Sequence, residues 1–139
     1  MVLSAILDTS ILIAAISTRE QHHLQAADVL REFAQGELTL PITILSETMS
    51  LISSRHGVSL QREVLDRIMA SGVSVLPVDT QVLARAREID GAYADAGFGF
   101  ADSTLLACCE ELRVARVLSL DRRLACYRPT FAPGLEILP

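Results

Sequence analysis

The chain has 139 residues, of which 50% are hydrophobic and 21% are charged, and this size suits a single domain, residues 1–139, with a sizeable core. All of its basic residues are arginine, which excludes P-loop nucleotide binding and Schiff-base catalysis, because both require lysine. No apolar run approaches the roughly 18 residues of a membrane helix and no signal-peptide pattern begins the chain, so we expect a soluble, cytoplasmic protein that does not contact a membrane.

Short apolar segments alternate along the chain with longer segments of helical periodicity. The longer segments repeat their apolar residues at i, i+3, i+4 and i+7, which is typical of helices that face a core. The predicted elements are, in chain order, a strand at 2–7, helices at 11–16 and 21–35, a strand at 38–40, helices at 42–56 and 60–70, a strand at 74–77, a helix at 79–96, a helix from Phe100, a strand at 116–120, a helical turn after Asp121 and a strand at 135–138. This alternation predicts βαβ crossovers and a central, mainly parallel sheet covered by helices on both faces.

Four carboxylates close or interrupt the apolar segments. Asp8 and Asp121 stand at the carboxyl ends of predicted strands, and Asp102 stands near the start of a helix. Glu47 falls within the apolar stripe of its helix, so we expect it on the face that points towards the sheet. Because ligands bind beyond the carboxyl ends of parallel strands, we expect the four acids to meet at one edge of the sheet.

Each of these acids has a structural alternative. Asp8 and Asp121 could cap the helices that follow them, and Asp102 could be favoured by the helix dipole. Glu47 lies in the middle of a helix, where no capping role exists. A cluster of like charges is costly without a cation, and carboxylate oxygens suit Mg2+ or Mn2+. The pattern therefore indicates metal-assisted hydrolysis of a phosphate compound.

Polar neighbours of these acids are further candidates. Thr9, Ser10 and Ser119 could hydrogen-bond a metal-bound water, although Ser10 could instead cap a helix. Arg122 and Arg123 could contact a nucleic-acid backbone, or they could simply be solvated at a helix start. The cysteines and histidines have neither the spacing of a zinc site nor that of a disulfide framework.

The segments around the acids resemble the PIN-domain nucleases, and most of all the VapC-type ribonuclease toxins of toxin–antitoxin pairs. The similar motifs are Leu-Asp-Thr-Ser-Ile-Leu-Ile-Ala around Asp8, Phe-Ala-Asp-Ser-Thr-Leu-Leu around Asp102 and Val-Leu-Ser-Leu-Asp-Arg-Arg around Asp121, together with Glu47 in the third predicted helix. The resemblance covers nearly the whole chain. Ser103 departs from it, because alanine commonly follows the third acid.

The resemblance implies a three-layer α/β/α fold and a Mg2+- or Mn2+-dependent endoribonuclease, a hydrolase that cuts single-stranded RNA. Asp8, Glu47 and Asp102 would be catalytic metal ligands. Asp121 would orient the attacking water or complete a second metal site. The alternative is a catalytically inactive PIN scaffold that binds RNA or protein, although loss of activity should have eroded at least one of the acids.

The resemblance also implies partners other than RNA. A small antitoxin protein would hold the toxin inactive, and the toxin would form a homodimer. An apolar groove between the early helices, with residues such as Leu24 and Leu51, could accept a helix of the inhibitor.

Overall fold

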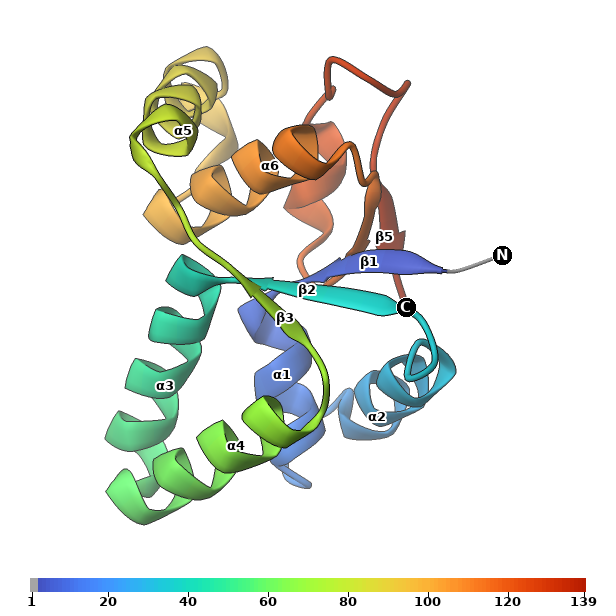
Figure 1. The fold of residues 1–139 in the computed structure, drawn as a ribbon, viewed down its shortest axis with the longest axis vertical. Helices are drawn as coiled ribbons and strands as arrows, with labels where there is room; N and C mark the ends of the chain where they lie inside the picture. The colour runs from blue at the N-terminus through green and yellow to red at the C-terminus, as the bar shows by residue number, and fades with distance from the viewer. Residues whose placement is uncertain (1–2) are drawn as a thin grey trace.

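Five short parallel strands form the central sheet of the computed structural model, which describes residues 3–139 (Figure 1). The strands are β1 (Ser4–Leu7), β2 (Glu37–Pro41), β3 (Ser74–Leu76), β4 (Arg116–Leu118) and β5 (Glu136–Leu138). Their order across the sheet is β3–β2–β1–β4–β5, so that β1 lies in the middle. The chain adds strands on one side of β1 first and on the other side afterwards. The β1–β4 pair is therefore the point of reversal at which such sheets bind ligands.

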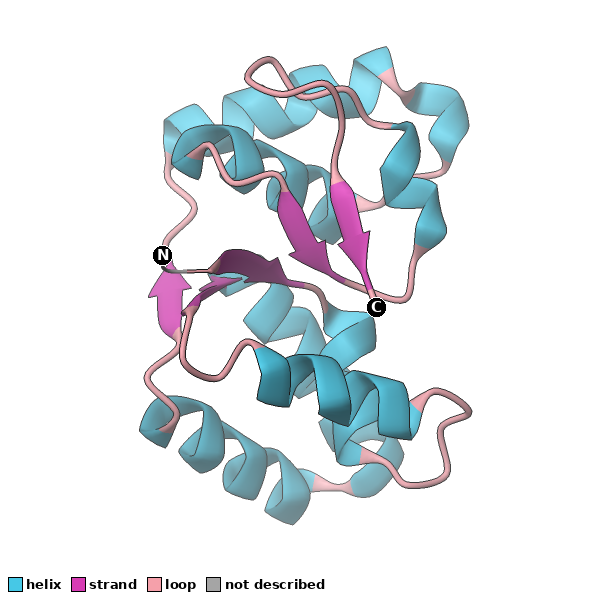
Figure 2. Cartoon of the chain, turned by 90° about the vertical axis from the view of Figure 1, so that its right-hand side faces the viewer, coloured by secondary structure: helices cyan, strands magenta, loops and turns pink. Residues whose placement is uncertain are grey.

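Helices cover both faces of this sheet. They are α1 (Thr9–Ile16), α2 (His23–Glu32), α3 (Ile42–His56), α4 (Val58–Ala70), α5 (Thr80–Ala92) and α6 (Phe100–Leu112), with short 3-10 helices η1 (Ala94–Ala96) and η2 (Arg122–Cys126). Figure 1 and Figure 2 show α1, α2 and α4 on one side of the strands and α5 and α6 on the other. The helix α3 begins directly after β2 and packs against α1, α4 and α6. The expected three-layer α/β/α fold is confirmed.

The core runs through β1 and α6. Ala5, Ile6 and Leu7 of β1 are all buried, as expected for a strand of a parallel sheet that is covered on both faces. Every residue from Ser103 to Cys109 of α6 is buried as well, so these turns are enclosed by the core on all sides. These two rigid elements carry Asp8 and Asp102, and they fix the positions of both acids.

The predicted order of elements is confirmed, with differences at several ends. The helix predicted at 79–96 stops at Ala92, because Tyr93 leaves the helical conformation and packs its ring against Phe98 and Tyr127. The strand β4 ends at Leu118, before the predicted end at residue 120, although the N–H of Ser119 still donates to Leu138 O at 2.7 Å. Val2, predicted as part of the first strand, lies outside the described residues. Within 3–139, no helix is long and apolar enough to cross a membrane.

Candidate active site

A cavity of about 410 Å³, the acid cavity, opens at the carboxyl ends of β1 and β4. It lies at the reversal point of the sheet, where a ligand site is expected. All four acids singled out in the sequence contribute to its wall. The lining consists of Asp8, Thr9, Ser10, Ile13, Ala14, Glu20, Glu47, Leu51, Arg55, Asp102, Leu120, Asp121 and Arg123.

Asp8 is buried and held by two serine hydroxyls. Ser119 Oγ donates to Asp8 Oδ2 over 2.6 Å, and Ser10 Oγ donates to the same oxygen over 3.1 Å. Each hydroxyl in turn accepts a main-chain N–H at 2.9 Å, Ser119 from Asp121 and Ser10 from Leu120. These N–H groups leave the hydroxyl protons available for Asp8. The two serines therefore fix this carboxylate, and Ser10 bonds a distant loop instead of capping its own helix.

The electrostatics differ from acid to acid. Burial raises the pKa of Asp8, although the hydrogen bonds from Ser119 and Ser10 oppose the rise. Burial also raises the pKa of Asp102, and the negative charges of Asp8 and Asp121 add to that increase. In contrast, hydrogen bonds from Arg123 lower the pKa of Asp121. Asp8, Asp102 and Asp121 are thus close enough for their charges to interact, and a cation would relieve their repulsion.

Arg123 links two of the acids. Its Nη2 lies 2.6 Å from Asp121 Oδ2 and 3.3 Å from Asp102 Oδ2. Asp121 also caps η2 by accepting the backbone N–H of Arg123 at 3.0 Å. The same residue therefore caps a helix and lines the acid cavity. Arg122 points elsewhere and donates to the carbonyl oxygens of Ile137 and Pro139 near the C-terminal end. Only Arg123 of this pair lines the acid cavity.

Glu47 departs from the expected position. The buried residues of α3 are Ile44, Thr48 and Ile52, at i, i+4 and i+8, whereas Glu47 is exposed. The expectation that Glu47 lies on the apolar face was therefore wrong, and Thr48 occupies that stripe instead. Thr48 Oγ1 donates to Ile44 O at 2.8 Å and lies 3.4 Å from Thr9 Oγ1. Glu47 still faces the acid cavity, because it borders the stripe on the side towards α6.

The donor chemistry fits a divalent metal, but the acids do not form a closed cage. Within residues 3–139, no three Asp, Glu, His or Cys side chains are grouped tightly enough to hold one ion together. Mg2+ usually keeps several waters and takes only one or two protein carboxylates, with substrate phosphates completing its shell. Carboxylates spread around an open cavity match that mode of binding.

Two lining residues were missed by the sequence analysis. Arg55, near the end of α3, and Glu20, in the loop after α1, both reach the acid cavity, with Arg55 Nη1 4.0 Å from Glu20 Oε1. Neither residue follows a strand or belongs to a motif. Their positions depend on how α1 and α3 pack, which no local pattern indicates.

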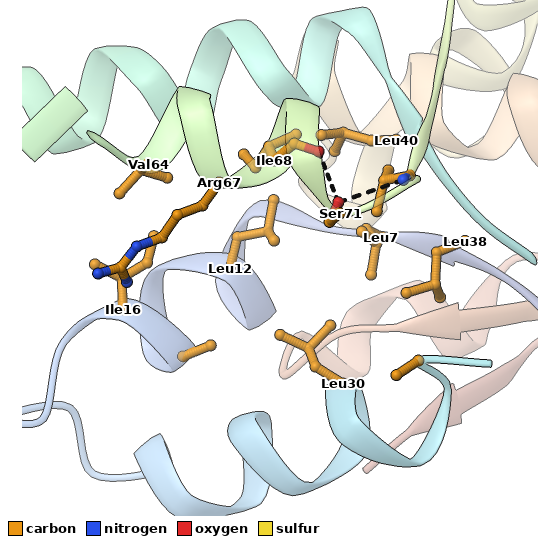
Figure 3. A pocket seen from close by; sticks show the side chains of 13 residues that line it. Leu7, Leu12, Ile16, Leu30, Leu38, Leu40, Val64, Arg67, Ile68 and Ser71 are labelled. Carbon is orange, nitrogen blue, oxygen red and sulfur yellow. Dashed lines mark hydrogen bonds between the residues drawn. The ribbon is translucent and has the colours of Figure 1, made fainter. Parts of the chain in front are cut away.

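A second hollow of about 360 Å³, the apolar groove, lies on the other side of α1 (Figure 3). It is bounded by α1, α2, β2 and α4. Leu24 and Leu51, which were expected to form such a groove, do not line it: Leu24 is 75% exposed on α2 and Leu51 faces the acid cavity. The lining consists of Leu7, Leu12, Ala15, Ile16, Leu30, Ala34, Leu38, Leu40, Val64, Arg67, Ile68, Ser71 and Val73.

Comparison with known proteins relates this arrangement to one family. The model of the PIN domain matches residues 5–128. Ribonuclease VapC26 of Mycobacterium tuberculosis is 24% identical over 135 residues, which cover 96% of this chain and 99% of that protein. Among solved structures, the sarcin–ricin loop cleaving toxin VapC20 of Mycobacterium tuberculosis superposes with a TM-score of 0.80 at 20% identity, covering 97% of this chain and 99% of that one. VapBC2 from Rickettsia felis, bound to a promoter DNA fragment, gives a TM-score of 0.72 at 16% identity over 97% of both chains.

Proposed function

Because this chain belongs to the PIN domain family, we propose that it is a metal-dependent endoribonuclease that cleaves single-stranded RNA and acts as the toxin of a toxin–antitoxin pair. The observation that carries the proposal is the acid cavity, in which four carboxylates from separate parts of the chain line one opening at the reversal point of the sheet. Capping alone would not bring all four together.

Asp8, Glu47 and Asp102 would hold Mg2+ or Mn2+, and Asp121 would orient the attacking water. The bound metal would supply a water of lowered pKa and would stabilise charge on the scissile phosphate. Ser10 and Ser119 keep Asp8 in one orientation, as groups behind metal ligands commonly do. Thr9 lies beside them in the cavity wall.

Arg123 and Arg55 are the basic residues that could contact RNA at this site, since both line the acid cavity. Phosphate contacts of this kind position a nucleic acid without reading its sequence. Arg122 is left out of this role because its guanidinium holds the C-terminal end of the chain.

The relatives support RNA as the substrate and an antitoxin as the partner. VapC26 is named a ribonuclease, and VapC20 is described as cleaving the sarcin–ricin loop. Similar folds occur in VapBC of Salmonella typhimurium and in a toxin–antitoxin complex from Klebsiella pneumoniae. An inactive scaffold is the second candidate, and cleavage assays separate the two.

The apolar groove is the proposed site for the antitoxin. Its aliphatic lining between α1, α2 and α4 suits the apolar face of an amphipathic helix, and Figure 3 shows Leu12, Leu30 and Ile68 pointing into it. A homodimer and a cytoplasmic location remain predictions, and sedimentation of the purified protein would test the first of them.

Expression in a bacterial host tests the proposal. The wild-type chain should arrest growth and generate new RNA ends, detected by sequencing, whereas Asp8→Asn should do neither at equal protein levels. If both proteins slow growth equally and leave the same RNA ends, the toxicity does not come from nuclease chemistry and the proposal fails.

A further inference from the structure

A second polar hollow, the side cavity, adjoins the acid cavity between α3 and the start of α6. Its volume is about 470 Å³, and it is lined by Thr43, Ser46, Glu47, Ser50, Leu51, Gly99, Phe100, Ala101 and Asp102. Glu47, Leu51 and Asp102 also line the acid cavity, so the two hollows are continuous along this edge. A chain molecule that reacts in one cavity would therefore pass the other.

Phe100 gives the side cavity its distinctive wall. Among the aromatic residues of the described part of the chain it is the most exposed, at 65%, whereas Phe33, Phe98 and Tyr127 are buried. Phe100 begins α6, whose next turns are buried in the core. The phenyl ring is thus presented to solvent by a rigid element, which is the way stacking platforms for nucleic-acid bases are built.

The other residues that line the side cavity favour a nucleotide base over a phosphate group. Ser46 and Ser50 present neutral hydroxyls, and the only charged groups in this wall are the shared acids Glu47 and Asp102. The arginines lie in the other hollow, where Arg55 and Arg123 line the acid cavity. Negative charge without arginine disfavours a phosphate in the side cavity, whereas a neutral base can stack on a phenyl ring and accept hydrogen bonds from serine.

We infer that the side cavity binds the unstacked base of a nucleotide next to the scissile phosphate, with its plane against Phe100. The inference rests on the proposed function and adds a substrate contact to the same site. A base must leave its helical stack to reach the ring, so this contact selects single-stranded RNA over duplex. A protein surface that covers Phe100 is the competing occupant, and the experiment separates it.

The absence of tryptophan from the chain makes a direct optical test possible. In an Asp8→Asn background, which leaves the RNA uncut, Phe100→Trp places a single indole in the side cavity. Adding single-stranded RNA of mixed sequence should quench its emission, and the same sequence as a duplex should quench it much less. Leu24→Trp is the matched control, because this exposed position on α2 lies outside both cavities and its emission should not change.

RNA affinity, measured by fluorescence anisotropy in the same background, gives the size of the contact. Phe100→Ala should weaken binding of the single strand by roughly 5-fold to 150-fold, the range for losing one base stacked on an aromatic ring. Phe100→Trp should retain the affinity, and Leu24→Ala should leave it unchanged.

The outcomes separate this inference from the proposed function. If the wild-type protein cuts RNA and the Phe100→Trp variant binds it without quenching, the side cavity holds no base and only the inference is overturned. If the wild-type protein neither cuts nor binds RNA, both fail. If Phe100→Ala leaves RNA affinity unchanged and alters the sedimentation mass, the ring belongs to a protein interface, and the inference is again overturned.

Discussion

The acid cavity and the apolar groove lie on opposite sides of α1 and differ in nearly every chemical respect. Ser10 and Ile13 of this helix face the acid cavity, whereas Leu12 and Ile16 face the groove. The acid cavity holds charged groups that hydrogen bonds fix in place, whereas the lining of the apolar groove is mostly aliphatic. One helix thus supports two surfaces, so mutations should be able to change catalysis and partner binding separately.

The largest effect on RNA cleavage is expected from mutation of the acids. Glu47→Gln should lower RNA cleavage by roughly a thousandfold or more, because it removes a proposed metal ligand that makes no contribution to the core. Glu20→Gln is the control, since Glu20 also lines the acid cavity but has no proposed metal contact. Initial rates on a labelled RNA would measure both. Equal losses in the two variants would mean that only the overall charge of the cavity matters.

Removal of a hydroxyl that holds Asp8 should have a smaller effect on RNA cleavage. Ser119→Ala removes the 2.6 Å hydrogen bond to Asp8 and the acceptor of the Asp121 N–H. Loss of such a supporting group typically costs about 10-fold to 100-fold in activity or metal affinity. The Mg2+ dependence of the cleavage rate would show the change. An unchanged Mg2+ midpoint and rate would contradict the supporting role of Ser119.

Mutations in the apolar groove should have the opposite effect, because they should weaken antitoxin binding and leave RNA cleavage unchanged. Leu30→Glu places a charge in the lining and should weaken antitoxin binding by about 30-fold, the cost of one well-packed contact, with RNA cleavage unchanged. Leu24→Glu changes the same residue type in the same helix outside the groove. Co-expressed antitoxin should rescue growth for Leu24→Glu but not for Leu30→Glu.

A second groove variant guards against misfolding in that experiment. Ala34 also lines the groove but is exposed, so Ala34→Glu leaves the core intact. If antitoxin inhibits Ala34→Glu and Leu30→Glu as well as it inhibits the wild-type protein, the partner binds another surface.

The smallest expected effect is on stability. The raised pKa of Asp8 means that the folded state disfavours the charged carboxylate, so stability falls as the pH rises through that pKa. In chelator at neutral pH, Asp8→Asn should therefore be more stable by roughly 1 kcal/mol, a few degrees in Tm. The gain should shrink as the pH falls towards the ordinary value of 3.8. A gain that stays constant over this range would show that charge is not the cause.

The acid cavity was far easier to predict from the sequence than the groove. Asp8, Asp102 and Asp121 all interrupt apolar segments. Asp8 and Asp121 follow parallel strands whose carboxyl ends share one edge of the sheet, and Asp102 stands near the start of α6 at the same edge. Aliphatic residues such as Leu12 and Leu30 carry no such signal, because the core and a groove use the same side chains. Their division between the two depends on helix packing, so the sequence could not show that Leu24 and Leu51 lie outside this groove.

Local ambiguity accounts for the other differences. Glu47 and Thr48 follow Ile44 by three and four residues, and both spacings place a side chain near the face of Ile44, so the periodicity of α3 could not decide which of the two faces the core. Likewise, nothing in an Arg-Arg pair tells which arginine meets an acid. The tight turn of η2 directs Arg123 to Asp121, whereas the Arg122 side chain donates to the carbonyl oxygen of Ile137 in β5.

Cleavage of a labelled single-stranded RNA by the purified protein tests the central claim most directly. The wild-type protein should cut the RNA with Mg2+ or Mn2+ and stop in chelator, whereas Asp8→Asn should cut in neither condition while melting as a folded protein. Equal cleavage by Asp8→Asn, or full wild-type activity in chelator, would contradict metal-dependent catalysis in the acid cavity.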